Sequence, residues 1–438
     1  MLSRLRLLIR CFASREEGSI AIIFAFAMFP LIGLVGASID YSAANSARTD
    51  LQAAMDSTAL MISKNAASLS AAELQARATA NFNALFDRPD AAASIQAVYA
   101  SDVGSSVTIT GSAAVRTSFI TALGLHSLNV STKSVVKWGN TRLRLALVLD
   151  VTGSMASAGK MTAMKTAAKD LLTQLKAAAT KDGDVYISII PFAKDVNVGA
   201  GNRTQQWINW ALWDAVNGSC SRRPDRNNTK SECVNDGGTW TVSSHNNWNG
   251  CVTDRDQDYD TRNTAPTTAT PATLFPAEQY STCPVAMMGL SYNWATLQSK
   301  IDAMQPNGGT NQVIGLQWGF QSLTSGPFTI PPKDPNYSYN QVIILLTDGL
   351  NTQNRWYGNG TTYDSRVDAR QQILCDNVKA AGITLYTVQV NTTGDPTSNV
   401  LKQCASGSDK FFLLTSASQM VDTFKQIGTA LSVLRIAM

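Results

Sequence analysis

The stretch "LALVLDVTGSM", from Leu145 to Met155, joins a run of aliphatic residues to an aspartate and two hydroxyl residues. A short apolar run of this kind, bounded by turn residues, is typical of a strand that is buried on both faces of a parallel sheet. In such sheets, ligands bind beyond the carboxyl ends of the strands. The stretch therefore predicts a buried strand and places Asp150, Thr152 and Ser154 at a ligand-binding edge.

Beyond this stretch, strand and helix patterns alternate as far as the C-terminus. The strand-like runs lie at 142–150, 184–193, 340–348, 383–390 and 410–414. The helical runs lie at 160–179, 294–304, 311–323, 370–382 and about 416–435. Long apolar strands separated by helices predict a mainly parallel, doubly wound sheet covered on both faces. We therefore expect an α/β domain over residues 141–438.

Further hydroxyl and carboxylate residues are expected at the same edge of this sheet. Thr310 lies in the loop "PNGGTN" between two helical runs, and Asp348 ends the strand "VIILLTDG". Two carboxylates and three hydroxyls would then converge. Hard oxygen ligands of low total charge suit Mg²⁺ or Mn²⁺. The alternative is that the aspartates only cap neighbouring helices.

The order and spacing of these residues resemble the metal-ion-dependent adhesion site of von Willebrand factor A domains. The family motif is Asp-x-Ser-x-Ser, then a distant Thr, then an Asp before Gly, and here a threonine replaces the first serine. The resemblance implies a metal site in which Ser154 and Thr152 bind the ion, the aspartates bind it directly or through water, and a carboxylate of a protein partner completes the octahedron. The implied set is Asp150, Thr152, Ser154, Thr310 and Asp348.

An uncharged segment from Gly18 to Ile39 is long enough to cross a bilayer. It is preceded by Arg4, Arg6, Arg10 and Arg15 and followed by Asp40. By the positive-inside rule, we expect residues 1–17 in the cytoplasm, a transmembrane helix at 18–40, and the rest of the chain in the bacterial periplasm or cell envelope. The alternative is a cleaved signal peptide, with a small-residue site at 35–38.

The residues after this segment predict a helical stalk at 41–68 and a small α+β spacer at 69–140. The spacer should hold one helix and three strands, at 94–101, 106–120 and 128–138, because these runs are rich in Val, Ile and Thr. No residue of the spacer suggests chemistry, so we expect it to serve packing and spacing.

Residues 15–65 resemble the N-terminal segment of TadE/TadG-like proteins of the tight-adherence (Flp) pilus system. The shared features are a Gly-Ser before the apolar segment, a proline within it, a Gly-x-x-x-Asp-Tyr exit and the stalk "LQAAMDSTAL". The resemblance implies a membrane-anchored, TadG-like component of a pilus machinery. Type IV prepilins carry a glutamate five residues after the cleavage glycine, but Ile23 stands there in this chain, so we expect an uncleaved anchor.

Cysteine use agrees with this compartment. The chain has seven cysteines, of which Cys11 alone precedes the apolar segment. An even number in the distal part of the chain fits disulfides in an oxidising compartment. Proximity in the sequence suggests the pairs Cys220–Cys233, Cys251–Cys283 and Cys375–Cys404. Buried free thiols in a cytosolic protein are the alternative.

Two insertions, at about 200–293 and 351–368, should form the rim of the metal site because each follows a strand that ends at that edge. The first carries Trp207, Trp210, Trp213, Trp240 and Trp248, which form either an exposed recognition surface or the small core of the insertion. It also carries aspartates at every second position from Asp254 to Asp260. They suggest either a loose Ca²⁺ site or salt bridges to Arg255, Arg262 or neighbours, since the EF-hand pattern fails.

Composition narrows the function. A net charge of +4 without a basic stripe does not favour nucleic-acid binding, and only two histidines, His126 and His245, argue against zinc catalysis and a Ser-His-Asp triad. We expect a non-enzymatic envelope component of a tight-adherence pilus that binds a protein partner through Mg²⁺. The alternatives are a pilus-independent, metal-dependent surface adhesin and an envelope hydrolase, for which the sequence offers no general base.

Overall fold

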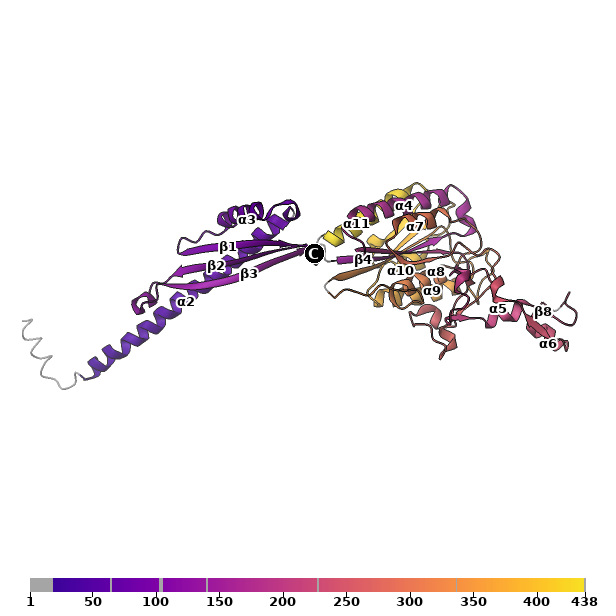
Figure 1. Cartoon of the computed structure of the whole chain (residues 1–438), viewed down its shortest axis with the longest axis horizontal. Coiled ribbons are helices and arrows are strands. Elements are labelled where there is room, and N and C mark those ends of the chain that lie inside the picture. Colours follow the sequence, from indigo (N-terminus) through magenta and orange to yellow (C-terminus); the bar gives the residue numbers. More distant parts are fainter. Residues whose placement is uncertain are drawn as a thin grey trace, which may run out of the picture. The chain divides into compact units, whose positions relative to one another are not determined.

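The computed structural model describes residues 19–63, 65–101, 105–138, 141–226, 228–335 and 337–436. The predicted cytoplasmic segment, with Cys11, lies outside the described residues, and so does Gly18, the first residue of the predicted span. The chain divides into two units after Trp138 (Figure 1).

The first unit begins with α2, a single continuous helix over Ser19–Ser63 that contains Pro30. Within the described residues, α2 is the one helix long and apolar enough to cross a membrane. Its apolar side chains near the N-terminus are exposed, for example Phe26 at 77% and Leu34 at 69%. Exposed apolar residues all round a helix are typical of a membrane span. One helix thus covers the predicted span from Ser19 onwards and the predicted stalk as far as Ser63.

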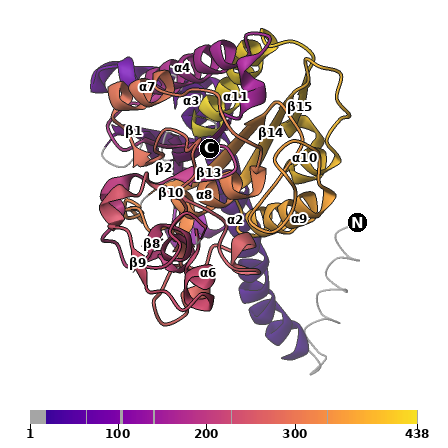
Figure 2. The same cartoon turned by 90° about the vertical axis from the view of Figure 1, so that its right-hand side faces the viewer.

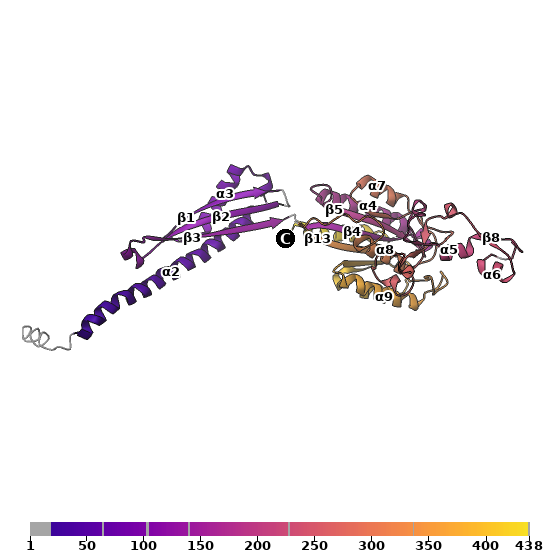
Figure 3. The same ribbon diagram turned by 60° about the horizontal axis from the view of Figure 1, so that its bottom comes forward.

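The second half of α2 packs on a small sheet together with α3 (Ala71–Leu85) (Figure 3). Leu51, Met55, Ala59 and Ile62, which recur at steps of three and four residues, are all buried. The sheet is antiparallel in the order β1-β2-β3, with bounds Ala91–Ala100, Ser105–Arg116 and Ser127–Trp138. A helix pair on a three-stranded sheet therefore follows the membrane segment.

The second unit is built on a sheet in which β4, β5, β13, β14 and β15 pair in parallel. These strands span Thr141–Asp150, Val185–Phe192, Ser338–Thr347, Thr384–Val390 and Phe411–Leu414. Three short strands pair antiparallel beyond or beside β5, namely β6 (Val196–Asn197), β10 (Cys251–Val252) and β12 (Met288–Ser291). The sheet path is β10-β6-β5-β4-β13-β14-β15, so the unit has the expected α/β class.

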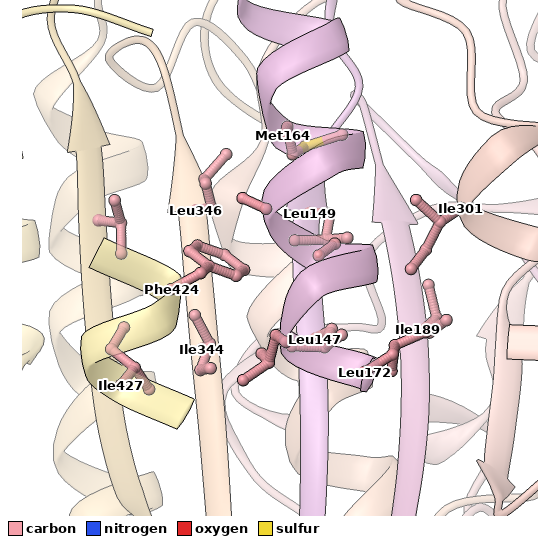
Figure 4. Packing of buried hydrophobic residues seen from close by; sticks show 14 of the residues in the cluster. Leu147, Leu149, Met164, Leu172, Ile189, Ile301, Ile344, Leu346, Phe424 and Ile427 are labelled. Carbon is pink, nitrogen blue, oxygen red and sulfur yellow. The ribbon is translucent and has the colours of Figure 1, made fainter. Parts of the chain in front are cut away.

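Helices cover both faces of this sheet (Figure 1). One face carries α4 (Lys160–Ala178), α7 (Trp294–Asp302) and α11 (Gln419–Ile436), and the other carries α8 (Gln312–Thr324), α9 (Ser365–Ala380) and α10 (Asn399–Cys404). Successive residues of β4 point to opposite faces. Leu147 and Leu149 enter the first core (Figure 4), and Ala146 and Val148 enter the second. The central strand is buried on both sides for this reason.

The long segment between β5 and α7 forms a loop-rich insertion beyond the end of the sheet where β4 ends (Figures 1 and 3). Figure 2 shows β8, β9 and α6 of this insertion gathered together. Its remaining regular elements are short: β7 (Ile208–Asn209), α5 (Ala211–Val216), β8 (Gly218–Cys220), α6 (Lys230–Asn235), β9 (Trp240–Val242) and β11 (Phe275–Pro276). Single turns of 3-10 helix occur at Ala66–Ser68, Ile120–Leu123, Gly153–Ala156, Ala200–Asn202, His245–Asn247, Tyr259–Thr261, Pro271–Thr273 and Ser408–Lys410.

Three disulfides connect the cysteines that proximity in the sequence pairs. Cys220–Cys233 and Cys251–Cys283 lie within the insertion, and Cys375–Cys404 joins α9 to α10. Loop-rich segments with few aliphatic residues depend on such cross-links because their own core is small.

The tryptophans of the insertion form its core and do not form an exposed recognition surface. Trp213 and Trp248 are buried, and the Trp210 ring lies between them with centroid distances of 5.6 and 5.2 Å. Trp207 packs edge-on against Trp318 of α8 at 6.1 Å, and Trp240 is half-buried. Of the two interpretations, the insertion core is the one that holds.

We expect Leu147→Ala to destabilise the second unit by about 2–5 kcal/mol, because truncation leaves a cavity between β4 and its covering helices. Chemical denaturation of the detergent-solubilised chain, followed by tryptophan fluorescence, measures the change. Leu413→Ala is the control, because Leu413 is 41% exposed and should cost far less. Equal losses for both variants would contradict the placement of Leu147 in the core.

Candidate metal centre

The two predicted aspartates stand at the ends of neighbouring parallel strands. In the pairing of β4 with β13, Leu149 lies opposite Leu346, so Asp150 and Asp348 come out at the same sheet edge. Both side chains are buried, with exposed fractions of 0% and 3%. The carboxyl ends of parallel strands meet at one edge, and this pairing therefore brings together two residues from distant parts of the chain.

The hydroxyl residues after β4 connect these two carboxylates. The Ser154 hydroxyl donates to Asp348 Oδ1 at 2.6 Å, and the Thr152 and Ser154 hydroxyl oxygens lie 3.1 Å apart. Asp150 Oδ1 accepts from the Thr152 backbone N–H at 2.7 Å, and Oδ2 accepts from the Thr347 hydroxyl at 2.6 Å. Four of the five predicted residues thus form one continuous set of contacts.

The loop that carries Thr310 is held against the loop after β4 by main-chain hydrogen bonds. Gly153 N donates to Gly308 O at 2.9 Å, and Asn307 N donates to Val151 O at 2.7 Å. Gly308 has φ +85°, and a Cβ there would lie 2.6 Å from the Tyr280 hydroxyl oxygen, so only glycine fits. Thr310 is 5% exposed and lies in the loop that these main-chain bonds hold beside the loop after β4.

Both insertions reach this loop, as their departure from the site edge predicts. The Tyr280 hydroxyl, in the first insertion, accepts from Gly309 N at 3.2 Å. Thr352, in the second insertion, accepts from Thr310 N at 2.9 Å through its hydroxyl and donates from its own N–H to Thr310 O at 2.9 Å. Both insertions therefore hold the Thr310 loop in place through hydrogen bonds.

Lys160 is a member of the site that the sequence reasoning missed. Its Nζ lies 2.5 Å from Asp348 Oδ2, and its side chain is 2% exposed. The signal in the sequence was the lysine at the very start of the helical run 160–179, where a cation is unfavourable because the helix dipole is positive. A carboxylate nearby offsets this cost.

Charge in the site is dominated by the two buried carboxylates. Burial, with a further contribution from the negative Asp348, raises the pKa of Asp150 to about 7. Positive charge therefore stabilises the site in its ionised form. In the described part of the chain, no three His, Cys, Asp or Glu side chains gather to hold a metal. The donor set instead combines two carboxylates with hydroxyls, which are hard oxygen ligands that fit a small divalent cation.

The acidic run of the first insertion is neutralised by arginines. Asp256 lies 2.6 Å from Arg355, and Arg370 lies 3.0 Å from Asp258 and 2.5 Å from Asp260. These arginines occupy the positions for which a Ca²⁺ ion was the alternative. The acidic run thus forms salt bridges, as one of the two interpretations predicts, but with Arg355 of the second insertion and Arg370 of α9 in place of Arg255, Arg262 or their neighbours.

Arg255 itself is buried, and its guanidinium donates to main-chain carbonyls of the same insertion, among them Thr264 O at 2.7 Å. Asp254 joins the insertions to the Thr310 loop: its Oδ2 accepts from Asn311 Nδ2 at 2.8 Å and from Arg355 N at 3.1 Å. Asp254 therefore connects the first insertion to the second insertion and to the residue after Thr310.

The ionisation of Asp254 should oppose folding. Burial raises its pKa to about 7 from an ordinary value of 3.8. The folded state then holds a proton that the unfolded state releases, so this residue lowers stability as the pH rises from about 4 to 7, at about 1.4 kcal/mol per pKa unit. Asp254→Asn keeps the acceptor oxygen and removes the charge. We expect its melting temperature, relative to that of the unmodified chain, to be higher at pH 8 than at pH 5.

The control for this experiment is Asp256→Asn, because Asp256 forms a half-exposed ion pair with Arg355. Parallel melting curves against pH for Asp254→Asn and the unmodified chain would contradict the buried, proton-holding state.

Three solved structures match this chain at 10–15% sequence identity. The pilus adhesin SpaC of Lactobacillus rhamnosus GG matches at 13% identity, 80% of this chain and 35% of that chain, with a TM-score of 0.36. The von Willebrand factor domain of the type V pili tip protein Mfa5 of Porphyromonas gingivalis matches at 10% identity, 68% and 97%, with a TM-score of 0.38. Proximal thread matrix protein 1 of the mussel byssus, solved with a zinc-occupied MIDAS motif, matches at 15% identity, 68% and 47%, with a TM-score of 0.34. This chain thus spans about a third of SpaC and just under half of the mussel protein.

Two family models match the chain, whereas no curated protein does. The model for Flp pilus-assembly TadE/G-like segments matches residues 18–61. The model for the von Willebrand factor type A domain matches residues 273–426, which include Thr310 and Asp348 and leave out β4. Residues 18–61 are therefore a TadE/G-like Flp pilus-assembly segment, and residues 273–426 belong to a von Willebrand factor type A domain.

Proposed function

We propose that this chain is a non-enzymatic, membrane-anchored envelope component of a tight-adherence (Flp-type) pilus system, and that it binds a protein partner through a Mg²⁺-dependent adhesion site. The TadE/G-like segment and the von Willebrand factor type A domain in one chain support this proposal. The observation that carries it is the hydrogen bond from Ser154 to Asp348, which joins the two halves of the site across neighbouring strands.

The residues proposed to hold the metal are Asp150, Thr152, Ser154, Thr310 and Asp348. Mg²⁺, or Mn²⁺ in its place, would supply a hard Lewis acid that accepts a carboxylate oxygen from the partner. The protein contributes the orientation of the donors. The Thr347 hydroxyl and the Thr152 N–H hold the Asp150 carboxylate, and the main-chain bonds around Gly153 and Gly308 fix the two loops.

The placement in the envelope follows from the N-terminal helix. We propose a single span at 18–40 in the inner membrane, with residues 1–17 cytoplasmic and the stalk at 41–68, the spacer at 69–140 and the adhesion domain at 141–438 in the periplasm. The exposed apolar side chains of α2 and the match to a pilus-assembly segment support this order. The two insertions contact the Thr310 loop and would therefore select the partner.

Asp150→Asn and Asp348→Asn should each weaken Mg²⁺ binding by at least about 100-fold, because each removes a charged oxygen ligand while the shape of the side chain is kept. Titration calorimetry on the purified chain measures the affinity, and circular dichroism reports the fold. Asp256→Asn is the matched control, because its carboxylate belongs to the acidic run and has no place in the proposed site. If all three variants bound Mg²⁺ like the unmodified chain, the proposed ligand set would be wrong.

Partner capture is tested by crosslinking in intact envelopes, followed by affinity purification with and without EDTA. We expect pilus-machinery proteins to be recovered only when Mg²⁺ is present, and to be lost from Asp150→Asn. Recovery that is the same with EDTA would contradict metal-dependent binding. Recovery of external surface proteins in place of pilus proteins would favour the pilus-independent adhesin.

A further inference from the structure

A buried lysine stands among the proposed metal ligands. Lys160 is the first residue of α4, and its Nζ faces Asp348 Oδ2 at 2.5 Å with 2% of the side chain exposed. Asp348 Oδ1 accepts the Ser154 hydroxyl, whereas Oδ2 accepts no hydrogen bond from any other described group. The Lys160 ammonium group therefore contacts Asp348 Oδ2, the carboxylate oxygen that accepts no hydrogen bond from the hydroxyl groups.

This position is unfavourable for a lysine on general grounds. Removing an ammonium group from water costs several kcal/mol unless it is paired. The N-terminus of a helix also repels a cation. The chain overcomes both effects only because Asp348, and beside it Asp150, supply negative charge.

We infer that Lys160 is the resident cation of the metal-free site and that it makes metal binding depend on an acidic ligand. When the carboxylates of Asp150 and Asp348 are both ionised, they and the Lys160 ammonium group together carry one net negative charge. A divalent cation then brings the site to one net positive charge, which a carboxylate from the partner neutralises. Without the lysine, the cation alone would neutralise the site. The metal and the partner carboxylate thus bind cooperatively. This inference rests on the proposed function.

Lys160→Met replaces the ammonium group by an apolar side chain of similar length. Titration calorimetry of the full chain with MgCl₂, in the presence and absence of acetate, measures the coupling. For the unmodified chain we expect acetate to tighten Mg²⁺ binding by at least about 10-fold. For Lys160→Met we expect tighter binding of Mg²⁺ alone, by at least about 10-fold, and little further effect of acetate.

Stability gives a second measurement that does not depend on affinity. Without metal, Lys160→Met should melt at a lower temperature than the unmodified chain, because two buried carboxylates lose their counter-ion. Mg²⁺ should raise the melting temperature of Lys160→Met by more than it raises that of the unmodified chain. Lys169→Met, on the same helix and 38% exposed, is the control and should change neither quantity. Lys160→Gln replaces Lys160→Met if the latter does not fold.

The outcomes separate this inference from the function on which it rests. If neither the unmodified chain nor Lys160→Met binds Mg²⁺, with or without acetate, the proposed adhesion site is wrong. If both bind Mg²⁺ with equal affinity and an equal effect of acetate, the site stands and the role of Lys160 is wrong.

A different observation concerns the turn between β2 and β3 in the first unit. This turn exposes three large apolar side chains, Phe119 at 47%, Leu123 at 70% and Leu125 at 55%. Their exposure would be costly in water, since each side chain is worth about 1.5–3 kcal/mol when fully buried.

The turn is attached to α2 next to its charge-free segment. Asp40 accepts the backbone N–H groups of Ser118, Phe119 and Ile120 at 2.9, 2.8 and 2.8 Å. The Phe119 side chain lies on Gly36, where a Cβ would stand 2.5 Å from the Phe119 Cβ. Gly36 precedes Asp40 by four residues, which at about 1.5 Å per residue is about 6 Å along the helix. Phe119 is thus held at the level of the apolar part of α2.

We propose that this turn inserts into the lipid bilayer beside α2, with Phe119, Leu123 and Leu125 among the lipid chains near the membrane surface. The occupant of the apolar surface is lipid because the same surface continues onto the exposed residues of the span, such as Val35 at 60% and Ile39 at 50%. Asp40 anchors the turn at the boundary between the bilayer and water.

The test uses the full chain, with Cys11→Ser, reconstituted in phosphatidylethanolamine–phosphatidylglycerol vesicles. A fluorophore on Leu123→Cys should be quenched by lipids that carry a nitroxide near the headgroup and protected from aqueous iodide. Val98→Cys is the control, because Val98 is 51% exposed on β1, and we expect the opposite pattern. Leu34→Cys reports whether α2 itself is inserted.

If the label at 123 behaves like the label at 98 while the label at 34 is quenched by lipid, the turn lies outside the bilayer and the proposal is overturned. It is equally overturned if the label at 34 is not quenched. Leu125→Cys serves as a second site in the turn if Leu123→Cys does not fold.

Discussion

The parallel pairing of β4 with β13 is the contact on which the candidate site depends. It sets Leu149 opposite Leu346 and so brings Asp150 and Asp348 to one edge. The pairing is stable because both strands are buried on both faces, and each fully buried aliphatic side chain contributes about 1.5–3 kcal/mol. Two carboxylates are thereby forced together in a buried place. That constraint creates the need for positive charge, which Lys160 meets in part and a metal ion would complete.

The insertions are built in a different way from the domain that carries them. The parallel sheet has a large aliphatic core, whereas the first insertion is held by disulfides, a tryptophan cluster and the buried Arg255. Disulfides and aromatic packing stabilise such a segment because it has few aliphatic residues to form a core. The acidic run joins the two insertions through Arg355, and Asp254 connects them to Asn311 beside Thr310. The two insertions are therefore connected to each other and to the loop that carries Thr310.

Hydrophobic periodicity predicted most of the regular elements. The run at 142–150 corresponds to β4, the run at 160–179 to α4, and the run at 311–323 to α8. These predictions work because long, strongly patterned segments are decided by which residues must be buried. The partners of the acidic run were not predictable, because Arg355 and Arg370 lie about a hundred residues away and nothing local selects them over Arg255 or Arg262.

The sequence by itself determined the apolar N-terminal helix, the α/β alternation and the residue types of the candidate metal site, because periodicity and motif are properties of neighbouring residues. Only the tertiary structure decided that Ser154 contacts Asp348, that the tryptophans face inward, and that Lys160 lies among the proposed ligands. The physical reason is that contacts between distant segments follow from strand order and from the burial of side chains in three dimensions. A lysine at the start of a helix looks like a surface residue until the fold places a buried carboxylate in front of it.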